Sequence, residues 1–337
     1  MEDINTSLYI TGEGTNVRVQ EKTLFINEEY YPVNAVTDIS LFGSYELHTS
    51  IFGLINQYGI ICHFFSYYDN YLGSFYPQSK KYNNLLILEQ YKIYCNETEL
   101  ERLKRQQTDE YRKQLFSVLK YYKRREYIDF LEYRENRNEN TLIEEALNKQ
   151  IYYKYFEKML GNFEFEYRSY QNKHNEINSF MNFVYSILYK DILNSIYKQG
   201  LDPRISFTHA VNNRKISSLE YDISDHLKII LSDRFIIKMI RSGKLKKEMF
   251  ELREDKYYLK REFIKIIISE YQLFMNKKYN YNLGSLTGYQ LIDETVKKYR
   301  NYFKNRDKIV SGKLLWYLLL WYMTSRQSRI LMEICWS

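Results

Sequence analysis

Three residues of types that bind divalent cations stand in separate parts of this chain: Glu145, His209 and Asp225. Carboxylate oxygens with one imidazole form a ligand set that suits Mg²⁺ or Mn²⁺, whereas structural zinc sites favour cysteine thiolates. Three protein ligands leave coordination positions open for a substrate. At a phosphodiester, such a cation can polarise a phosphoryl oxygen and activate an attacking hydroxyl. We therefore treat these three residues as candidate metal ligands and candidate catalytic residues.

Each candidate also has an ordinary structural interpretation. Glu144 and Glu145 fall in the first turn of a predicted helix, where carboxylates interact favourably with the helix dipole. Only one of them can face a given site, because adjacent helical residues point about 100° apart. A loop histidine such as His209 is usually only a polar residue. Asp222 lies three residues before Asp225 on the same predicted helix face, where two carboxylates repel unless a cation lies between them, so Asp222 is a further candidate catalytic residue.

Two helices and the loop between them are expected to position these side chains. Asn140 or Thr141 can cap the helix that carries the glutamate. Gly200 ends a helix and Pro203 prevents its continuation, which places the histidine on a loop or at a new helix start. A serine at 217–218 can cap the helix that carries the two aspartates.

Basic and aromatic residues are interleaved in the segment 120–127, Lys-Tyr-Tyr-Lys-Arg-Arg-Glu-Tyr. Lys and Arg can neutralise phosphates, and Tyr can stack on unpaired bases. Such a run is usually a solvated helix face, but here we favour a DNA-binding surface formed by Lys120, Lys123, Arg124 and Arg125. Two further groups stay open between these interpretations: Arg241, Lys244, Lys246 and Lys247, and Lys297, Lys298, Arg300, Lys304 and Arg306.

The composition indicates a folded, largely helical chain. Of its 337 residues, 45% are hydrophobic and 27% are charged, which allows a buried core and argues against disorder. The presence of only 12 Gly and 3 Pro favours long helices. A net charge of +7 permits a polyanionic partner without requiring one.

The sequence gives no sign of export or membrane insertion. Cys62, Cys95 and Cys335 have no paired spacing, which fits a reducing cytosol. The polar N-terminal residues 1–7 do not resemble a signal peptide. The longest apolar run, 314–323, is too short to span a bilayer. We expect a cytoplasmic protein with no membrane partner.

Two halves of the chain follow different periodicities. Alternating segments separated by turn signals predict short strands at 8–10, 17–19, 24–26, 36–39 and 60–65. A short helix capped at 49–50 and closed by Gly59 is expected among them. Apolar residues at three- and four-residue spacing predict helices in the rest, among them 97–135, 140–160 and 176–199. The expected fold class is α+β, with a small β-rich N-terminal domain at 1–80, a linker at 81–90 and a larger all-α catalytic, DNA-binding domain at 91–337.

Four stretches of the sequence carry a family resemblance. They are Leu8 to Thr15; 39–44 with 63–66 and 71–76; Glu145-Ala146 with Tyr152 and Tyr153; and 200–203 up to His209, followed by 218–225. The last two are specific in their order and spacing. Together these stretches resemble CRISPR-associated protein one, the endonuclease and integrase of spacer acquisition, from Leu8 to about Asp233.

The resemblance implies a role for each candidate. Glu145, His209 and Asp225 would hold Mg²⁺ or Mn²⁺, with Asp222 alongside. The implied reaction is the attack of a 3′-hydroxyl of a short DNA fragment on a repeat phosphodiester of a CRISPR array, so the implied substrates are protospacer fragments and the CRISPR repeat. A homodimer through the β-rich domain and an assembly with the small second CRISPR adaptation protein are also implied.

The chain matches the family pattern at Asn178 and Tyr185 and departs from it at a few positions. Ala146 and Ser206 stand where Gly is usual, and Lys228 stands where Arg is frequent. Lysine keeps the charge but loses the bidentate geometry of arginine. The segment 314–337 matches nothing in the family. It is compatible with a packed last helix, a partner surface or an altered reading frame.

Two other functions stand as alternatives. A catalytically inactive DNA-binding scaffold of the same fold would bind DNA in a salt-sensitive way without metal-dependent activity. An unrelated helical interaction protein would show neither property. In that case Glu145, His209 and Asp225 would lie far apart in space.

Overall fold

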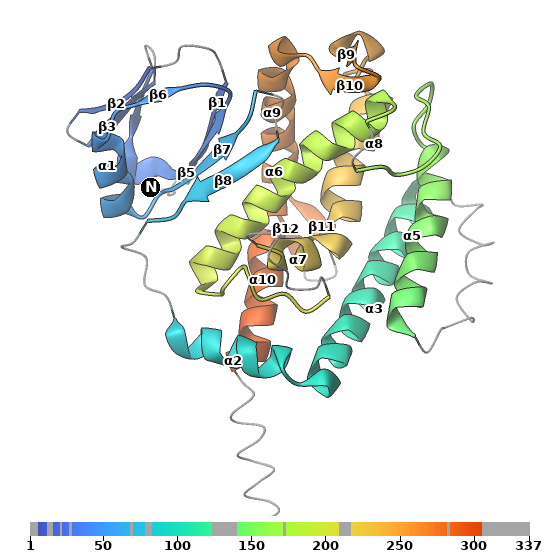
Figure 1. Ribbon diagram of the computed structural model, residues 1–337. Coiled ribbons are helices and arrows are strands. Elements are labelled where there is room, and N and C mark those ends of the chain that lie inside the picture. The colour runs from blue at the N-terminus through green and yellow to red at the C-terminus, as the bar shows by residue number, and fades with distance from the viewer. Residues whose placement is uncertain are drawn as a thin grey trace, which may run out of the picture.

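The N-terminal part of the molecule contains two small sheets and one helix, and the rest is mostly helical (Figure 1). The computed structural model describes residues 6–11, 16–20, 22–26, 29–67, 70–77, 83–122, 140–170, 173–208, 217–281 and 284–304. The α+β class predicted from the two periodicities is confirmed. Among the described residues, no helix is both long and apolar enough to cross a membrane.

The first sheet has four strands in the order β1-β5-β7-β8. Its strands are β1 (Thr6–Thr11), β5 (Val36–Phe42), β7 (Ile61–Phe65) and β8 (Tyr71–Phe75). The first three pair in parallel, and β8 is antiparallel to β7. Strand β5 is buried at almost every position, as is typical of a strand covered on both faces.

The second sheet has the order β4-β3-β2-β6. Its strands are β2 (Asn16–Gln20), β3 (Thr23–Ile26), β4 (Glu29–Pro32) and β6 (Glu46–Leu47). A single 3₁₀ turn (Val33–Ala35) leads from β4 into β5. Helix α1 (Ser50–Tyr58) packs on β2 and ends at Gly59, whose φ of 66° is the left-handed conformation that glycine adopts most easily. These elements share a core of their own around Val17, Leu24, Ile39 and Ile51.

The second part of the chain is a bundle of helices, with bounds close to those predicted for the segments that are described. The helices are α2 (Asn84–Tyr94), α3 (Glu97–Tyr122), α5 (Thr141–Glu157), α6 (Glu176–Gln199), α7 (Leu219–Leu227), α8 (Arg234–Arg241), α9 (Arg261–Asn276) and α10 (Gly288–Lys304). A π-helical segment (Lys228–Asp233) joins α7 to α8. Asn140 caps α5 with its side chain, as expected. Residues 84–90 of the predicted linker belong to α2.

Helix α6 lies in the middle of the helical domain (Figure 1). It is buried on nearly all sides, and α7, α10 and the π-helical segment pack against it. The helix is apolar around most of its circumference, which is the pattern of a core helix. Helix α7, which carries Asp222 and Asp225, therefore rests on this central helix, whereas α5, which carries Glu145, packs against α3.

Two short hairpins interrupt the helical domain, which the periodicity had predicted to be helical throughout. They are formed by β9 (Phe250–Arg253) with β10 (Lys256–Leu259), and by β11 (Tyr279–Tyr281) with β12 (Gly284–Leu286). A 3₁₀ turn (Lys247–Met249) precedes β9. Glu254 and Asp255 both have positive φ, as the tight turn of a two-residue hairpin requires. Strands of three or four residues are too short to show their period in a sequence.

A buried ion cluster joins the β-rich N-terminal region to the helical region. Lys190 of α6 lies 3.0 Å from the Asp38 carboxylate of β5 and 2.7 Å from the carboxylate of Asp191. Its ammonium also donates to the Tyr9 hydroxyl at 3.0 Å. Burial alone would lower the pKa of Lys190, but the two carboxylates raise it, so the lysine stays charged. The cluster fixes the first sheet against α6.

Candidate functional site

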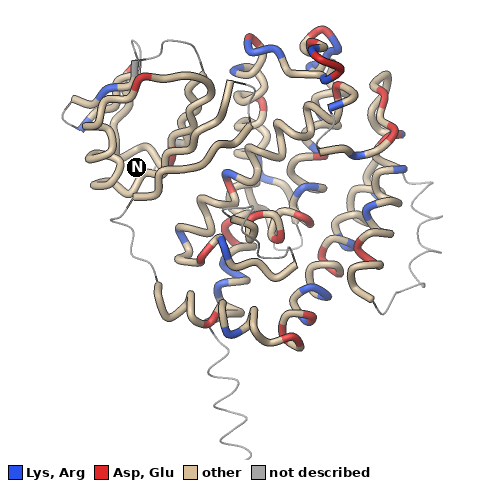
Figure 2. Tube along the Cα trace, in the orientation of Figure 1, with Lys and Arg blue, Asp and Glu red and all other residues tan. Residues whose placement is uncertain are grey.

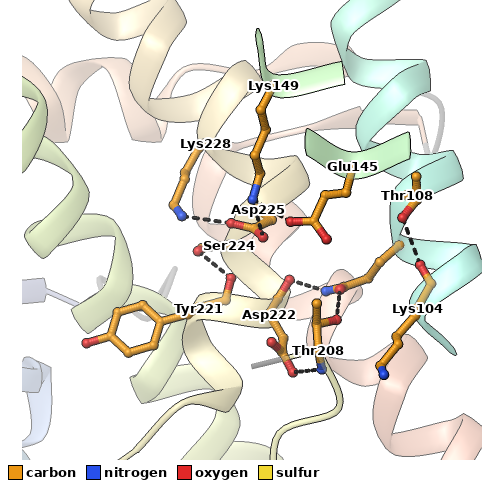
Figure 3. A network of polar contacts seen from close by, with 11 residues as sticks. Lys104, Thr108, Glu145, Lys149, Thr208, Tyr221, Asp222, Ser224, Asp225 and Lys228 are labelled. Atoms are coloured by element: carbon orange, nitrogen blue, oxygen red, sulfur yellow. Dashed lines mark hydrogen bonds and ion pairs between the residues drawn. The ribbon is translucent and has the colours of Figure 1, made fainter. Parts of the chain in front are cut away.

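Glu145 of α5 and Asp225 of α7 share a single cation, the ammonium of Lys149 (Figure 3). The Lys149 Nζ lies 2.5 Å from Glu145 Oε1 and 3.2 Å from Asp225 Oδ2. Two carboxylates this close together would repel each other. The positive charge of the ammonium between them offsets this repulsion and holds the two helices together here. The structure thus brings together two of the three candidate metal ligands.

The neighbouring Glu144 has a different environment. Its carboxylate is almost fully buried and accepts hydrogen bonds from Arg105 at 2.6 Å and from Arg112 at 3.1 Å, both of α3. Two arginines of α3 neutralise this buried carboxylate, so Glu144 forms a structural contact between α5 and α3. Glu145 is the member of the pair that faces Asp225.

Lys228 is the second cation at Asp225. Its ammonium donates to Asp225 Oδ1 at 2.8 Å, and it lies over the rings of Tyr185 and Tyr189. Burial alone would lower the pKa of Lys228, but the Asp225 carboxylate raises it well above the usual value. The pKa of Lys149 is also raised: the carboxylates of Asp225 and Glu145 outweigh its burial. Both lysines are therefore charged near neutral pH, and together they balance the two carboxylates.

The carboxylate of Asp222 has different hydrogen-bond partners from that of Asp225. Its Oδ2 accepts hydrogen bonds from the backbone amides of Phe207 at 2.6 Å and Thr208 at 3.0 Å, and the residue is fully buried. Gln107 of α3 strengthens this contact, because it accepts a hydrogen bond from the Thr208 hydroxyl and donates one to the backbone carbonyl of Asp222. Asp222 and Gln107 thus tie the residues before position 209 to α7 and α3.

His209, the third candidate ligand, lies outside the described residues, which stop at Thr208 and resume at Ser217. In the described part of the chain, no group of three or more His, Cys, Asp or Glu side chains forms a metal-binding cluster. The two described carboxylates fit a hard divalent cation, because their oxygens already surround one positive charge. One further ligand would complete a site of the expected type.

A pocket of about 840 Å³ opens beside Asp225. Its lining combines charged side chains of both signs with tyrosine rings and includes Lys149, Lys228, Arg168, Glu157, Glu166, Tyr153, Tyr185 and Tyr189. Asp233 of the π-helical segment also lines it and accepts hydrogen bonds from the hydroxyls of Tyr152 and Tyr185, both at 2.7 Å. Burial raises the pKa of Asp233 to about 6, although these hydrogen bonds act in the opposite direction.

Arg168 is positioned at this pocket by asparagines of α6. It donates to the amide oxygens of Asn178 at 3.1 Å and Asn182 at 2.6 Å, and its guanidinium lies over the Tyr185 ring. Asn178 and Tyr185, the two residues that match the family pattern in this helix, therefore contact the same arginine. Arg168 could not be selected from the sequence, because nothing in its local sequence distinguishes it from other arginines.

The predicted DNA-binding group is only partly described. Lys120 lies exposed in the last turn of α3, whereas Lys123, Arg124 and Arg125 lie outside the described residues. Tyr122 at the end of α3 carries the guanidinium of Arg241 over its ring at 4.7 Å, which connects this region to the second basic group.

Other residues of the two open groups pair with acids. The ion pairs are Lys244 with Glu270, Lys246 with Glu248, Lys297 with Glu294 and Lys298 with Glu110. Basic and acidic residues are interspersed along the described helices (Figure 2). These pairs are typical of a solvated helix surface.

The fold and the site together define a class: an α+β protein with a β-rich N-terminal region, a mostly helical second region and an acidic centre beside a tyrosine-lined pocket that carries both basic and acidic side chains. Residues 8–273 match the family described as CRISPR associated protein Cas1, and the chain belongs to this family.

Known proteins resemble the chain along most of its length. The CRISPR-associated endonuclease Cas1 of Fusobacterium nucleatum is 28% identical over 328 residues, covering 89% of this chain and 97% of that protein. The solved structure of TM1797, a CAS1 protein from Thermotoga maritima, superposes with a TM-score of 0.79 at 24% identity, covering 88% of this chain and 97% of that one. A casposase bound to integration product shares the fold, with a TM-score of 0.77 at 20% identity over 89% of this chain and 91% of that chain.

Proposed function

We propose that this protein is a metal-dependent DNA endonuclease and integrase of CRISPR adaptation. It would insert short DNA fragments as new spacers when their 3′-hydroxyls attack a repeat phosphodiester. The observation that carries the proposal is the Lys149 ammonium shared by Glu145 and Asp225, next to a pocket whose wall includes Lys228, Arg168 and several tyrosine rings. Family membership supports the same reaction.

Glu145, Asp225 and His209 are the residues that would hold Mg²⁺ or Mn²⁺ in this proposal. When bound, the cation would polarise a phosphoryl oxygen and lower the pKa of the attacking hydroxyl. The ammonium of Lys149 lies within hydrogen-bonding distance of both carboxylates. Lys149 would therefore leave this position when these carboxylates hold the metal ion. Its charge would then be available for a phosphate oxygen.

The other residues of the site would bind and orient DNA. Lys228 and Arg168 are fixed positive charges on the pocket wall, which can orient a phosphate before the reaction. The rings of Tyr185 and Tyr189 offer surfaces for an unpaired base. Asp222 would act as a positioning residue, because its carboxylate holds the backbone just before His209.

The assembly and the division of labour between domains belong to the same proposal. Residues 1–80 would form the dimerisation domain and 91–337 the catalytic, DNA-binding domain. Lys120, Lys123, Arg124 and Arg125 would contact the DNA backbone, which positions DNA without specifying its sequence. The partners would be a second copy of the chain and the small second protein of the adaptation pair.

A strand-transfer assay tests the proposal. A short duplex with free 3′-hydroxyls would be incubated with plasmid carrying a CRISPR repeat, with the partner protein, and with Mn²⁺ or EDTA. Wild type should join the DNA only with Mn²⁺, and His209→Ala and Glu145→Gln should lose joining. Glu164→Gln, an exposed glutamate just after α5, is the matched control and should keep it. DNA that is bound but never cut or joined would instead indicate a scaffold of the same fold.

A further inference from the structure

One face of α2 is apolar and exposed to solvent. Leu85, Leu88 and Tyr91 are 76%, 55% and 49% exposed, and their three-residue spacing places them on one side of the helix. The opposite side, with Leu86 and Ile93, is buried in the core of the helical domain. A helix that is apolar on both sides is normally covered on both sides. We call Leu85, Leu88 and Tyr91 the α2 stripe.

The described chain ends beside this helix. Helix α10 packs against α2, and its C-terminal end reaches α2 in Figure 1. Near that end, the Tyr302 hydroxyl donates to Glu99 in the first turn of α3, and the guanidinium of Arg102 lies 5.9 Å from the centre of the Tyr302 ring. Helix α3 begins directly after α2. The residues that follow Lys304 therefore start next to the C-terminal end of α2.

We propose that residues 314–323 of the same chain dock on the α2 stripe. This segment, Leu-Leu-Trp-Tyr-Leu-Leu-Leu-Trp-Tyr-Met, is the longest apolar run of the sequence and matches the leucine and tyrosine chemistry of the stripe. The connecting residues 305–313 can span about 30 Å when extended. Helix α2 is about 16 Å long, so the whole stripe is within reach.

The covalent connection through residues 305–313 favours residues 314–323 of the same chain as the occupant of the α2 stripe. A linked segment meets its own α2 at an effective concentration on the order of millimolar, far above that of a second copy in dilute solution. The run is also too short to span a bilayer. Docking would cover the exposed leucines without any other molecule.

Tryptophan fluorescence reports only on the residues after 304, because the three tryptophans of the chain are Trp316 and Trp321 in the docking segment and Trp336 beyond it. In the full-length protein we expect emission shifted to the blue of free tryptophan and weak quenching by acrylamide. The double variant Leu85→Glu/Leu88→Glu should shift the emission to the red and steepen the quenching.

A matched control uses two leucines with similar exposure on other elements. Leu252 of β9 and Leu273 of α9 are 58% and 65% exposed. The double variant Leu252→Glu/Leu273→Glu adds the same charge and should leave emission and quenching unchanged. An α2 variant that behaves like wild type overturns the proposal. So does a blue shift that depends on protein concentration or that arises only with phosphatidylglycerol vesicles, since these indicate a second copy or a lipid surface.

A second measurement leaves α2 itself intact. Cys95 is exposed at the end of α2, and Cys62 is buried. In a Cys335→Ser background, bimane attached to Cys95 should be quenched by the docked tryptophans. Replacing Trp316 and Trp321 by phenylalanine should restore the bimane emission. Emission that these replacements do not change would contradict docking even if the charged α2 variant fails to fold.

Discussion

Glu145 and Asp225 lie on different helices, yet both carboxylates contact the ammonium of Lys149, at 2.5 and 3.2 Å. This geometry already places two hard oxygen donors around one positive charge. Lys228 adds a second charge on the far oxygen of Asp225. The two lysines therefore neutralise the charges of Glu145 and Asp225. A divalent cation would have to compete with one of these lysines for the carboxylate oxygens.

Replacing Lys149 by Met tests this competition. Without its ammonium, Glu145 and Asp225 repel each other, so the variant should be less stable in EDTA by about 1 kcal/mol, since the lysine is partly exposed and the pair is screened. Added Mn²⁺ should restore the loss, and half-saturation should need less Mn²⁺ than in wild type. Thermal unfolding across a Mn²⁺ titration measures both effects. A variant that needs more metal than wild type would show that Lys149 supports the cation instead of competing with it.

Gln107 should matter for activity through the backbone it holds. Gln107→Leu removes the hydrogen bonds that Gln107 makes with the Thr208 hydroxyl and the Asp222 carbonyl, which costs about 1–3 kcal/mol of stability. Strand transfer should fall strongly while DNA affinity stays close to that of wild type.

Gln90→Leu is the matched control for this prediction. Gln90 is equally buried and also bridges a backbone segment, but it holds Asp202 instead of Thr208. The control should lose similar stability and keep its rate per folded molecule. Equal losses of activity in the two variants would reduce Gln107 to a purely structural role.

Asp233 should make stability depend on pH. Burial raises its pKa from 3.8 to about 6 in the folded protein, so the folded state binds this proton more tightly than the unfolded state. Ionisation therefore costs stability: the cost is absent below about pH 4, grows up to pH 6 and is constant above, at about 3 kcal/mol. Asp233→Asn cannot ionise, so its stability relative to wild type should rise between pH 4 and pH 7. Urea unfolding at several pH values measures this difference, and a difference that does not change with pH would contradict the assignment.

The sequence allowed much of the fold to be predicted, because long helices such as 97–122 show their period directly. The hairpins at 250–259 and 279–286 could not be predicted, since strands this short leave almost no periodic signal. The π-helical turn at 228–233 packs against α6, and no local pattern in the sequence marks it.

Selecting Glu145 over Glu144 depended on family resemblance, because adjacent carboxylates look alike in a sequence. The structural distinction comes from Arg105 and Arg112, which bury Glu144 from a separate helix. Lys149 could have been found from its position four residues after Glu145. Gln107 could not, because its partners belong to α7 and to the loop before it.

Direct measurement of Mn²⁺ binding tests the central claim most sharply. Electron paramagnetic resonance of free Mn²⁺ would be titrated with wild type, Glu145→Gln, Asp225→Asn and the control Glu164→Gln. We predict tight Mn²⁺ binding to wild type and to the control, and a strong loss of binding in both site variants with their folds intact. Unchanged Mn²⁺ binding in Glu145→Gln and Asp225→Asn would contradict the assignment of these carboxylates as metal ligands.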